Sequence, residues 1–349
     1  MRLLVVGAGS TGGYFGGRLA QAGRDVTFLV RPRRAAQLEA SGLQVTSPHG
    51  DFTLAPKLVT AGSIASHFDA ILLTVKSYAF EASLEDFAPA IGPDTMILPV
   101  LNGMRHMDAL AARFGKHAVA GCVCKIPAQL DREGRIVHLG EFHELTYGEL
   151  DGSRTPRIGE LDALMQDAVF NARLSSAIVR EMWEKWVMLA TLAGITCLMR
   201  GSVGEIVAAP GGSDFVNRFL DEAAATAAAG HPPSEDFLAH TRALLTAKGS
   251  PLTASMFRDL QAGAPIEADQ IVGDLKTDDQ LADQARSNTP DQFKLVFDPK
   301  GIAAVIARME RNEGISSQLM SNEELRGAAL ELMMQQVYTH FREGTQPAA

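Results

Sequence analysis

The residues Gly7 to Gly12 are the first group whose types and spacing suit a chemical task. An apolar run precedes them and a helix-like segment follows, which predicts a tight turn between a strand and a helix. Gly7 permits a sharp turn, Gly9 leaves room for a pyrophosphate, and Gly12 allows close packing of the helix on the sheet. The N–H groups that open the helix also suit phosphate, so we predict a dinucleotide-binding turn rather than an accidental glycine-rich one. Its residues are Gly7, Ala8, Gly9, Ser10, Thr11 and Gly12.

Arginines follow the second apolar run, where NAD-binding domains usually carry an acidic residue for the ribose 2′-hydroxyl. Arg31 ends that run, and Arg33 and Arg34 follow Pro32. A guanidinium presents a fork of N–H donors to a 2′-phosphate, so we predict NADPH as the cofactor and Arg31 as its ligand. The alternative is a solvated basic start of a helix after Pro32.

Lys76 and Asn102 each follow an apolar run that reads as a buried strand, residues 69–75 and 96–100. The carboxyl ends of parallel strands meet at one edge of a sheet, where ligands bind in open α/β folds. We therefore place both residues beside the cofactor. The alternatives are a surface cap for Lys76 and a plain turn for Asn102-Gly103.

A lysine interrupts a long helical segment whose apolar residues lie on nearly every side. Burying the charge of Lys185 there costs free energy, which favours a functional role for this residue. The alternatives are that its side chain reaches the surface or pairs with Glu181 or Glu184. Farther on, Ser255 and Glu267 flank a break at Gly263 and Pro265. Ser255 alone also fits a helix cap, and Glu267 a helix N-terminus.

The order of these residues along the chain indicates an α/β domain followed by a helical domain. We predict a Rossmann-type dinucleotide-binding domain over residues 1–168, an all-α substrate domain over 169–275 and an atypical helical tail over 276–349. Within the first domain, residues 43–45 and 52–54 predict a hairpin, and 135–138 and 144–148 predict a closing β-meander. Almost no strand signal follows residue 161.

Composition excludes several other classes of protein. The chain has 349 residues, a formal net charge of −9 and 46% hydrophobic residues, which fits a folded protein and argues against a nucleic-acid coat. Its three cysteines lack metal-site spacing and suggest a reducing compartment. With no signal peptide and no apolar run of membrane-spanning length, we expect a cytoplasmic protein without membrane or metal.

Taken together, these motifs resemble the ketopantoate reductase (2-dehydropantoate 2-reductase) family. The resemblance covers roughly residues 1–275 and rests on several motifs in the right order. They are GAGSTGGYFGGRLAQAGRDVTFLVR, Val75-Lys76, Asn102-Gly103, Trp183-Glu184-Lys185, and Ser255-Met256 with Glu267.

The resemblance implies a role for each matching residue in an NADPH-dependent oxidoreductase of pantothenate biosynthesis. The glycine turn and Arg31 would hold NADPH, and Lys76 and Asn102 would face its nicotinamide half, with Asn102 also near the substrate. Lys185 matches the lysine that protonates the substrate carbonyl. Ser255 matches a contact to the substrate carboxylate. Glu267 matches the acid that orients the lysine and the cofactor ribose.

The sequence departs from that family where substrate would bind, because family members line the pocket with asparagines. Leu189 and Ala193 share a helix face with Lys185, and Val203 and Leu252 are also apolar. We therefore expect a 2-oxo acid or ketone less polar than ketopantoate. The alternatives are another hydroxy-acid dehydrogenase on the same plan, and an NADP(H)-binding sensor or partner-binding protein without turnover.

The segment after residue 275 is a second departure. Residues 302–309 and the spacing of Leu330, Met333, Val337 and Phe341 predict helices. The segment suits a fused extension, an oligomerisation arm or a partner-binding helix, and a homodimer remains open.

Overall fold

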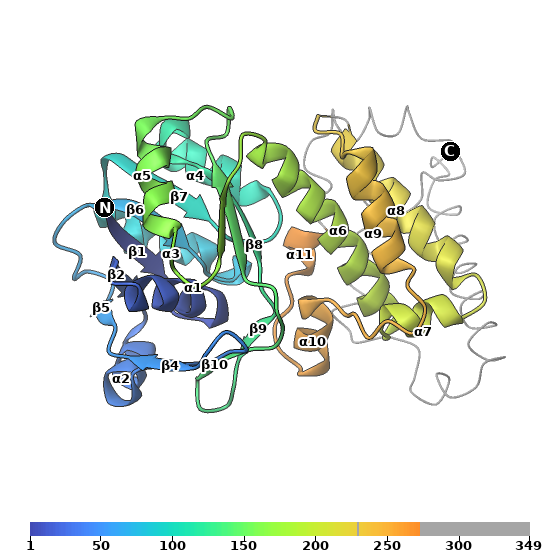
Figure 1. Ribbon diagram of the computed structural model, residues 1–349, viewed down its shortest axis with the longest axis horizontal. Coiled ribbons are helices and arrows are strands. Elements are labelled where there is room, and N and C mark those ends of the chain that lie inside the picture. Colours follow the sequence, from blue (N-terminus) through green and yellow to red (C-terminus); the bar gives the residue numbers. More distant parts are fainter. Residues whose placement is uncertain (229, 273–349) are drawn as a thin grey trace, which may run out of the picture. The chain divides into compact units, whose positions relative to one another are not determined.

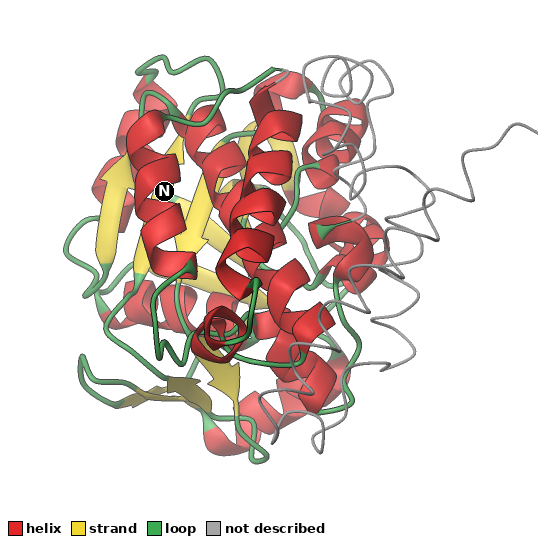
Figure 2. Cartoon of the chain, turned by 90° about the vertical axis from the view of Figure 1, so that its right-hand side faces the viewer, coloured by secondary structure: helices red, strands yellow, loops and turns green. Residues whose placement is uncertain are grey.

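The computed structural model of the protein describes residues 1–228 and 230–272 (Figure 1). The chain divides into two compact units, Met1–Met182 and Trp183–Ala349. Every strand among the described residues lies in the first unit, and the described part of the second unit is helical (Figure 2). This confirms an α/β fold with a helical C-terminal region. The segment 276–349, for which we predicted helices, lies outside the described residues.

A five-stranded parallel sheet forms the centre of the first unit. Across the sheet the strands are β5 (Lys57–Val59), β2 (Asp25–Leu29), β1 (Arg2–Val6), β6 (Phe68–Leu73) and β7 (Ile91–Pro99). In chain order, β2 and β5 lie on one side of β1, and β6 and β7 lie on its other side. The strand order therefore reverses at β1.

The two faces of this sheet bury different helices because side chains alternate along each strand. Leu3 and Val5 of β1 belong to a core that includes residues of α1 (Ser10–Gln21), α2 (Pro32–Ser41) and α5 (Pro156–Met165). Leu4 and Val6 belong to the opposite core, with residues of α3 (Phe80–Phe87) and α4 (Arg105–Phe114). All four β1 side chains are at most 3% exposed, so the strand is fixed from both sides.

Two smaller sheets complete the first unit. One has the order β4-β3-β10-β9 and the other β12-β11-β8. Their strands are β3 (Leu43–Thr46), β4 (Phe52–Leu54), β9 (Ala128–Leu130), β10 (Ile136–His138), β8 (Gly121–Lys125), β11 (Glu144–Gly148) and β12 (Asn171–Leu174). The antiparallel pairing of β3 with β4 confirms the predicted hairpin.

The predicted β-meander over 135–138 and 144–148 is wrong, because these strands lie in different sheets. β10 pairs in parallel with β3, and β11 pairs with β8 and β12. Alternating apolar residues reveal that a short segment is a strand, but they carry no information about its partner. β12 also shows that strand structure continues past residue 168, within the first unit rather than the second.

The second unit is built around α6 (Ile178–Met199), whose first residues still belong to the first unit. The other helices follow in chain order: α7 (Val203–Ala208), α8 (Gly212–Ala228), α9 (Glu235–Leu245), α10 (Ser255–Gln261) and α11 (Ala268–Ile271) (Figure 1). Val187 of α6 packs in a core with Leu220 and Ala223 of α8, and this core extends to Phe237 of α9. Among the described residues, no helix combines the length and the apolar character that a membrane crossing requires.

Candidate functional site

One edge of the parallel sheet gathers the predicted residues of the first unit. The glycine turn follows β1, Arg31 follows β2, Lys76 follows β6 and Asn102 follows β7. Because these strands are parallel, all four segments leave the sheet at its carboxyl edge, and the glycine turn leaves at the strand where the order reverses. The fold therefore brings these four segments to one edge, as the sequence predicted.

The shape of the glycine turn suits a phosphate-bearing ligand. Gly7 has φ of +97°, a conformation that favours glycine, and a Cβ at Gly12 would lie 2.2 Å from the carbonyl oxygen of Gly7. A Cβ at Gly9 would have no heavy atom within 4 Å. Gly7 and Gly12 are therefore required by the protein's own backbone conformation and packing, whereas the space beside Gly9 is open.

Helix α1 begins beside that open space without a side-chain cap. Gly9 occupies the N-cap position with no side-chain hydrogen bond, and the first turn contains no acidic residue. The first-turn N–H groups and the positive end of the helix dipole are therefore not neutralised by the helix's own residues. This arrangement fits the pyrophosphate of a dinucleotide.

Thr74 holds the glycine turn, a role that the sequence did not reveal. Its Oγ1 lies 2.9 Å from the carbonyl oxygens of both Val6 and Gly7, and it would be 2.1 Å from a Cβ at Gly12. The hydroxyl group therefore fills the space that Gly12 leaves. The signal was present in the sequence as a threonine inside the apolar run 69–75, but many threonines in such runs are ordinary strand residues.

The arginines after β2 separate into two kinds. Arg31 and Arg33 are exposed, whereas Arg34 is half-buried and points back into the protein. Arg34 donates from Nε to the carbonyl oxygen of Ala8 at 3.1 Å, and from Nη1 to Gln37 at 2.7 Å and to the carbonyl oxygen of Gly134 at 2.9 Å. Burial lowers the pKa of its guanidinium, which nevertheless remains charged.

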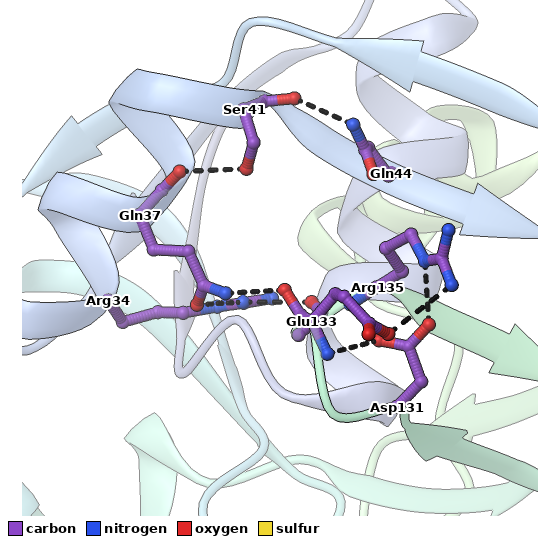
Figure 3. A network of polar contacts seen from close by, with 8 residues as sticks. Arg34, Gln37, Ser41, Gln44, Asp131, Glu133 and Arg135 are labelled. Carbon is purple, nitrogen blue, oxygen red and sulfur yellow. Dashed lines mark hydrogen bonds and ion pairs between the residues drawn. The ribbon is translucent and has the colours of Figure 1, made fainter.

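Arg34 thereby joins the glycine turn to the β9–β10 turn. Figure 3 shows Arg34 and Gln37 next to Glu133 of the latter turn. Gln37 supports the same contact by donating to the carbonyl oxygen of Glu133 at 2.6 Å. Within the β9–β10 turn, Asp131 and Arg135 form an ion pair of 2.6 Å. Arg34 is committed to this structural network, whereas Arg31 and Arg33, which also follow β2, are exposed.

In the second unit, α6 carries Lys185 partly buried on the same face as Leu189 and Ala193. The two acidic residues considered as partners for this lysine have other contacts. Glu181 forms an ion pair with Arg173, and the carboxylate of Glu184 accepts hydrogen bonds from the backbone and hydroxyl group of Ser234.

The segments that carry Lys185 and Glu267 are joined by a buried hydrogen bond. Trp186, the residue after Lys185, donates from its indole nitrogen to the carbonyl oxygen of Ile271 at 2.9 Å. Ile271 ends α11, and Glu267 occupies the N-cap position of that helix with only 5% of its surface exposed. The fold therefore ties together the segments of two of the predicted catalytic residues.

Ser255 lies on the surface at the first position of α10. The N-cap of this helix is Ala254, so the alternative interpretation of Ser255 as the helix cap is wrong. α10 ends at Gln261 and Gly263 follows with φ of +66°, which confirms the predicted helix break. The exposed position is compatible with a contact to a ligand.

The apolar positions that distinguish this sequence differ in exposure. Ala193 and Val203 are 1% and 0% exposed, whereas Leu189 and Leu252 are partly exposed. The backbone N–H of Val203 donates to the carbonyl oxygen of Leu252 at 2.9 Å, so these two positions are neighbours.

Comparison with known proteins identifies the family. A family model described as ketopantoate reductase PanE/ApbA matches residues 3–152, and the model of its C-terminal part matches residues 177–291. The chain belongs to the ketopantoate reductase family. The match covers both units, in the order expected from the sequence.

Individual relatives agree with this assignment. The chain is 36% identical to the "Uncharacterized oxidoreductase YkpB" of Bacillus subtilis over 78% of its own length and 90% of that protein. It is 26% identical to a 2-dehydropantoate 2-reductase of Mesorhizobium japonicum, covering 81% of this chain and 93% of that one. The structure matches a 2-dehydropantoate 2-reductase of Geobacter metallireducens with a TM-score of 0.75 and 28% identity, over 89% of this chain and 99% of that one.

Proposed function

We propose that the protein is an oxidoreductase that reduces a 2-oxo acid to the 2-hydroxy acid with NADPH, and that Lys185 donates the proton. The observation that carries this proposal is the glycine turn at the carboxyl edge of the parallel sheet. Its open space beside Gly9, the uncapped start of α1 and the exposed Arg31 suit a phosphorylated dinucleotide. Family membership supports both the cofactor and the class of substrate.

The glycine turn and Arg31 would hold the phosphates of NADPH, and Lys76 and Asn102, which follow β6 and β7, would position its nicotinamide half. NADPH held there would supply the hydride for the carbonyl carbon of the substrate. The ammonium group of Lys185 stabilises the negative charge that develops on the carbonyl oxygen and transfers a proton to it. Glu267 positions the lysine and the cofactor ribose, and Ser255 contacts the substrate carboxylate.

We further propose that the substrate carries a less polar substituent than ketopantoate. Leu189 lies one helical turn after Lys185 and offers no hydrogen bond to a hydroxylated substrate. An unpaired polar group costs roughly 1–3 kcal/mol, which corresponds to about a 5- to 150-fold preference for the apolar substrate. The Leu189→Asn variant should shift the ratio of kcat/KM values toward ketopantoate by a factor in this range.

The decisive experiment measures NADPH oxidation with a panel of 2-oxo acids that includes ketopantoate, aliphatic and aryl members. The assay uses the wild type, Lys185→Ala, and Lys248→Ala as a control at an exposed lysine of the same unit. We expect Lys185→Ala to lower kcat by about 10²- to 10⁴-fold, with the Kd for NADPH and the control variant unchanged.

Each alternative predicts a different outcome of this panel. A wild type that binds NADPH tightly and reduces none of the carbonyl compounds would favour the sensor, which the apolar substitutions also suit. Full activity of Lys185→Ala would exclude the proton-donor role. Ordinary catalytic efficiency with ketopantoate would refute the less polar substrate. A parallel titration with NADH tests the role of Arg31, because NADH lacks the 2′-phosphate.

A further inference from the structure

A half-buried guanidinium contacts the middle of the glycine turn. Arg34 of α2 donates from Nε to the carbonyl oxygen of Ala8 at 3.1 Å, and Ala8 lies between Gly7 and Gly9. Neither the proposed reduction nor the assignment of the 2′-phosphate to Arg31 uses this contact. Its effect on the glycine turn therefore has to be worked out separately.

The contact fixes the orientation of the peptide group that joins Ala8 to Gly9. In a planar trans peptide the carbonyl oxygen and the following N–H point in opposite directions. Because the Ala8 carbonyl oxygen points to Arg34, the N–H of Gly9 points away from it. Thr74 Oγ1 acts on the preceding peptide group in the same way, since it lies 2.9 Å from the carbonyl oxygen of Gly7. Two successive carbonyl groups of the turn are thus held by side-chain donors of the protein.

The positive charge of Arg34 is not neutralised by the groups that it contacts. Its acceptors are the carbonyl oxygens of Ala8 and Gly134 and the amide oxygen of Gln37, all of which are uncharged. Its Nη2 is buried and has no hydrogen-bond partner among the described residues. A partly buried charge costs free energy unless an opposite charge is near it. Arg34 therefore suits an anionic ligand at the glycine turn.

The acidic residues of the β9–β10 turn have a different partner. Asp131 forms an ion pair with Arg135 at 2.6 Å, and Glu133 contacts the same guanidinium at 3.3 Å. Asp131 also accepts hydrogen bonds from the backbone N–H groups of Glu133 and Arg135, at 3.0 and 2.8 Å. This turn therefore carries its own cation, and what it presents to Arg34 is a carbonyl oxygen rather than a carboxylate.

The β9–β10 turn also holds the Arg34 side chain in place. Gly134 has φ of +78°, and a Cβ there would lie 2.3 Å from Gln37 Nε2 and 2.8 Å from Arg34 Nη1. Glycine is thus required both by the backbone conformation and by the close approach of the two side chains. Gln37 accepts from Arg34 at 2.7 Å and donates to the carbonyl oxygen of Glu133 at 2.6 Å (Figure 3). The guanidinium is therefore held on two sides, by the glycine turn and by the β9–β10 turn.

We propose that Arg34 is a positioning residue for the pyrophosphate of the dinucleotide and acts through the peptide group between Ala8 and Gly9. It orients the N–H of Gly9 toward the phosphates and adds a positive charge beside the glycine turn. This role rests on the proposed function, because it takes the glycine turn to be the cofactor site. Arg31 and Arg34 then have different tasks, since Arg31 meets the 2′-phosphate whereas Arg34 does not distinguish NADPH from NADH.

Arg34 should therefore affect how tightly the cofactor binds and not how fast it reacts. We expect Arg34→Gln, which removes the charge, to raise the Kd for NADPH by about tenfold. The kcat at saturating NADPH and the KM for the 2-oxo acid should stay close to those of the wild type. Arg34→Lys keeps the charge but not the fork of donors, so it should recover part of the affinity.

Adenosine diphosphate ribose is the probe that separates the pyrophosphate from the 2′-phosphate, because it has the first and lacks the second. The experiment is a calorimetric titration of the full chain with NADPH and with adenosine diphosphate ribose. We expect Arg34→Gln to raise both Kd values by the same factor. Arg31→Gln should instead weaken the binding of NADPH alone.

Arg24→Gln is the matched control in the same unit. Arg24 is also partly buried and donates to two carbonyl oxygens, those of Leu164 and Gln166, both at 3.0 Å. It precedes β2, so it lies at the opposite edge of the parallel sheet from the glycine turn. Arg24→Gln should lower the stability of the fold in urea and leave both Kd values unchanged.

Urea unfolding verifies that each variant is folded, and Arg34→Lys, which keeps the charge and a long side chain, takes the place of Arg34→Gln if the latter is not. Unchanged Kd values for both ligands in the folded Arg34 variants would overturn the positioning role and leave Arg34 as a structural residue. Weakening of NADPH alone would also overturn it, since Arg34 would then act at the 2′-phosphate. Wild-type protein that binds neither ligand would refute the proposed cofactor as well. Failure of the proposed reaction shows separately, as protein that binds NADPH but reduces none of the 2-oxo acids.

Discussion

Replacing Gly9 with alanine should separate cofactor binding from folding. Gly9 has φ of −80° and ψ of −164°, which alanine adopts without strain, and its Cβ would have no heavy atom within 4 Å. Alanine also has fewer conformations than glycine in the unfolded chain. The free energy of unfolding of Gly9→Ala should therefore stay unchanged or rise by about 0.4–1 kcal/mol.

The same methyl group would occupy the space that we assign to the pyrophosphate beside the first turn of α1. A hydrogen bond to a charged group contributes about 1.5–3 kcal/mol, and losing one raises a dissociation constant about 10- to 150-fold. We expect the Kd for NADPH to rise by this factor. Fluorescence titration with NADPH and urea unfolding of the same preparation measure the two effects.

Gly12→Ala is the matched control, because there the methyl group meets the protein itself. Its Cβ would lie 2.1 Å from Thr74 Oγ1 and 2.2 Å from the carbonyl oxygen of Gly7, and a backbone oxygen cannot rotate away. Overpacking of this kind costs about 1–3 kcal/mol of stability. Gly9→Ala protein that binds NADPH like the wild type would refute the pyrophosphate position, and Gly9→Ala protein as unstable as Gly12→Ala would refute the open space.

Three further changes test contacts elsewhere in the structure. Thr74→Val removes a hydroxyl group that contacts two carbonyl oxygens at 2.9 Å and should cost about 1 kcal/mol in urea unfolding, whereas Thr74→Ser should keep most of it. Trp186→Phe removes the donor to Ile271 and should cost a similar amount and lower kcat, while the Kd for NADPH stays unchanged. Arg157 holds the pKa of buried Glu149 below its ordinary value of 4.5, so this pair's stabilisation is complete above pH 4.5 and is lost as the pH falls through the lowered pKa. Glu149→Gln should lower stability at neutral pH and flatten that acid dependence, and unchanged acid unfolding would contradict the assignment.

The fold was predictable where local patterns determine structure. Continuous apolar runs correctly located β1, β2, β6 and β7, because a parallel strand buried on both faces needs such a run. The pairing of β10 with β3 was not predictable in the same way. Its registered partners, Ile136 with Val45, are about ninety residues apart, and a strand of three residues does not specify a partner.

The candidate site was predictable to the level of segments but not of side-chain direction. The sequence placed three arginines after β2 without distinguishing them. In the structure Arg34 is bound to the carbonyl oxygen of Gly134, a hundred residues away, whereas Arg31 is exposed. Only the position of the distant β9–β10 turn makes this distinction, and no spacing within residues 31–34 contains it.

The burial of the four apolar positions limits which of them can determine the substrate selectivity that we propose. Four apolar positions distinguish the sequence, but Val203 has no exposed surface and Ala193 has almost none. A polar side chain there would meet other parts of the protein and cost about 1–3 kcal/mol if unpaired. Leu189 and Leu252 are partly exposed, so of the four positions these two are the ones that we propose contact the substrate. The backbone hydrogen bond from Val203 to Leu252 does not involve either side chain, so a substitution of Leu252 leaves that bond in place. Selectivity against hydroxylated substrates is thus expected to rest on Leu189 and Leu252.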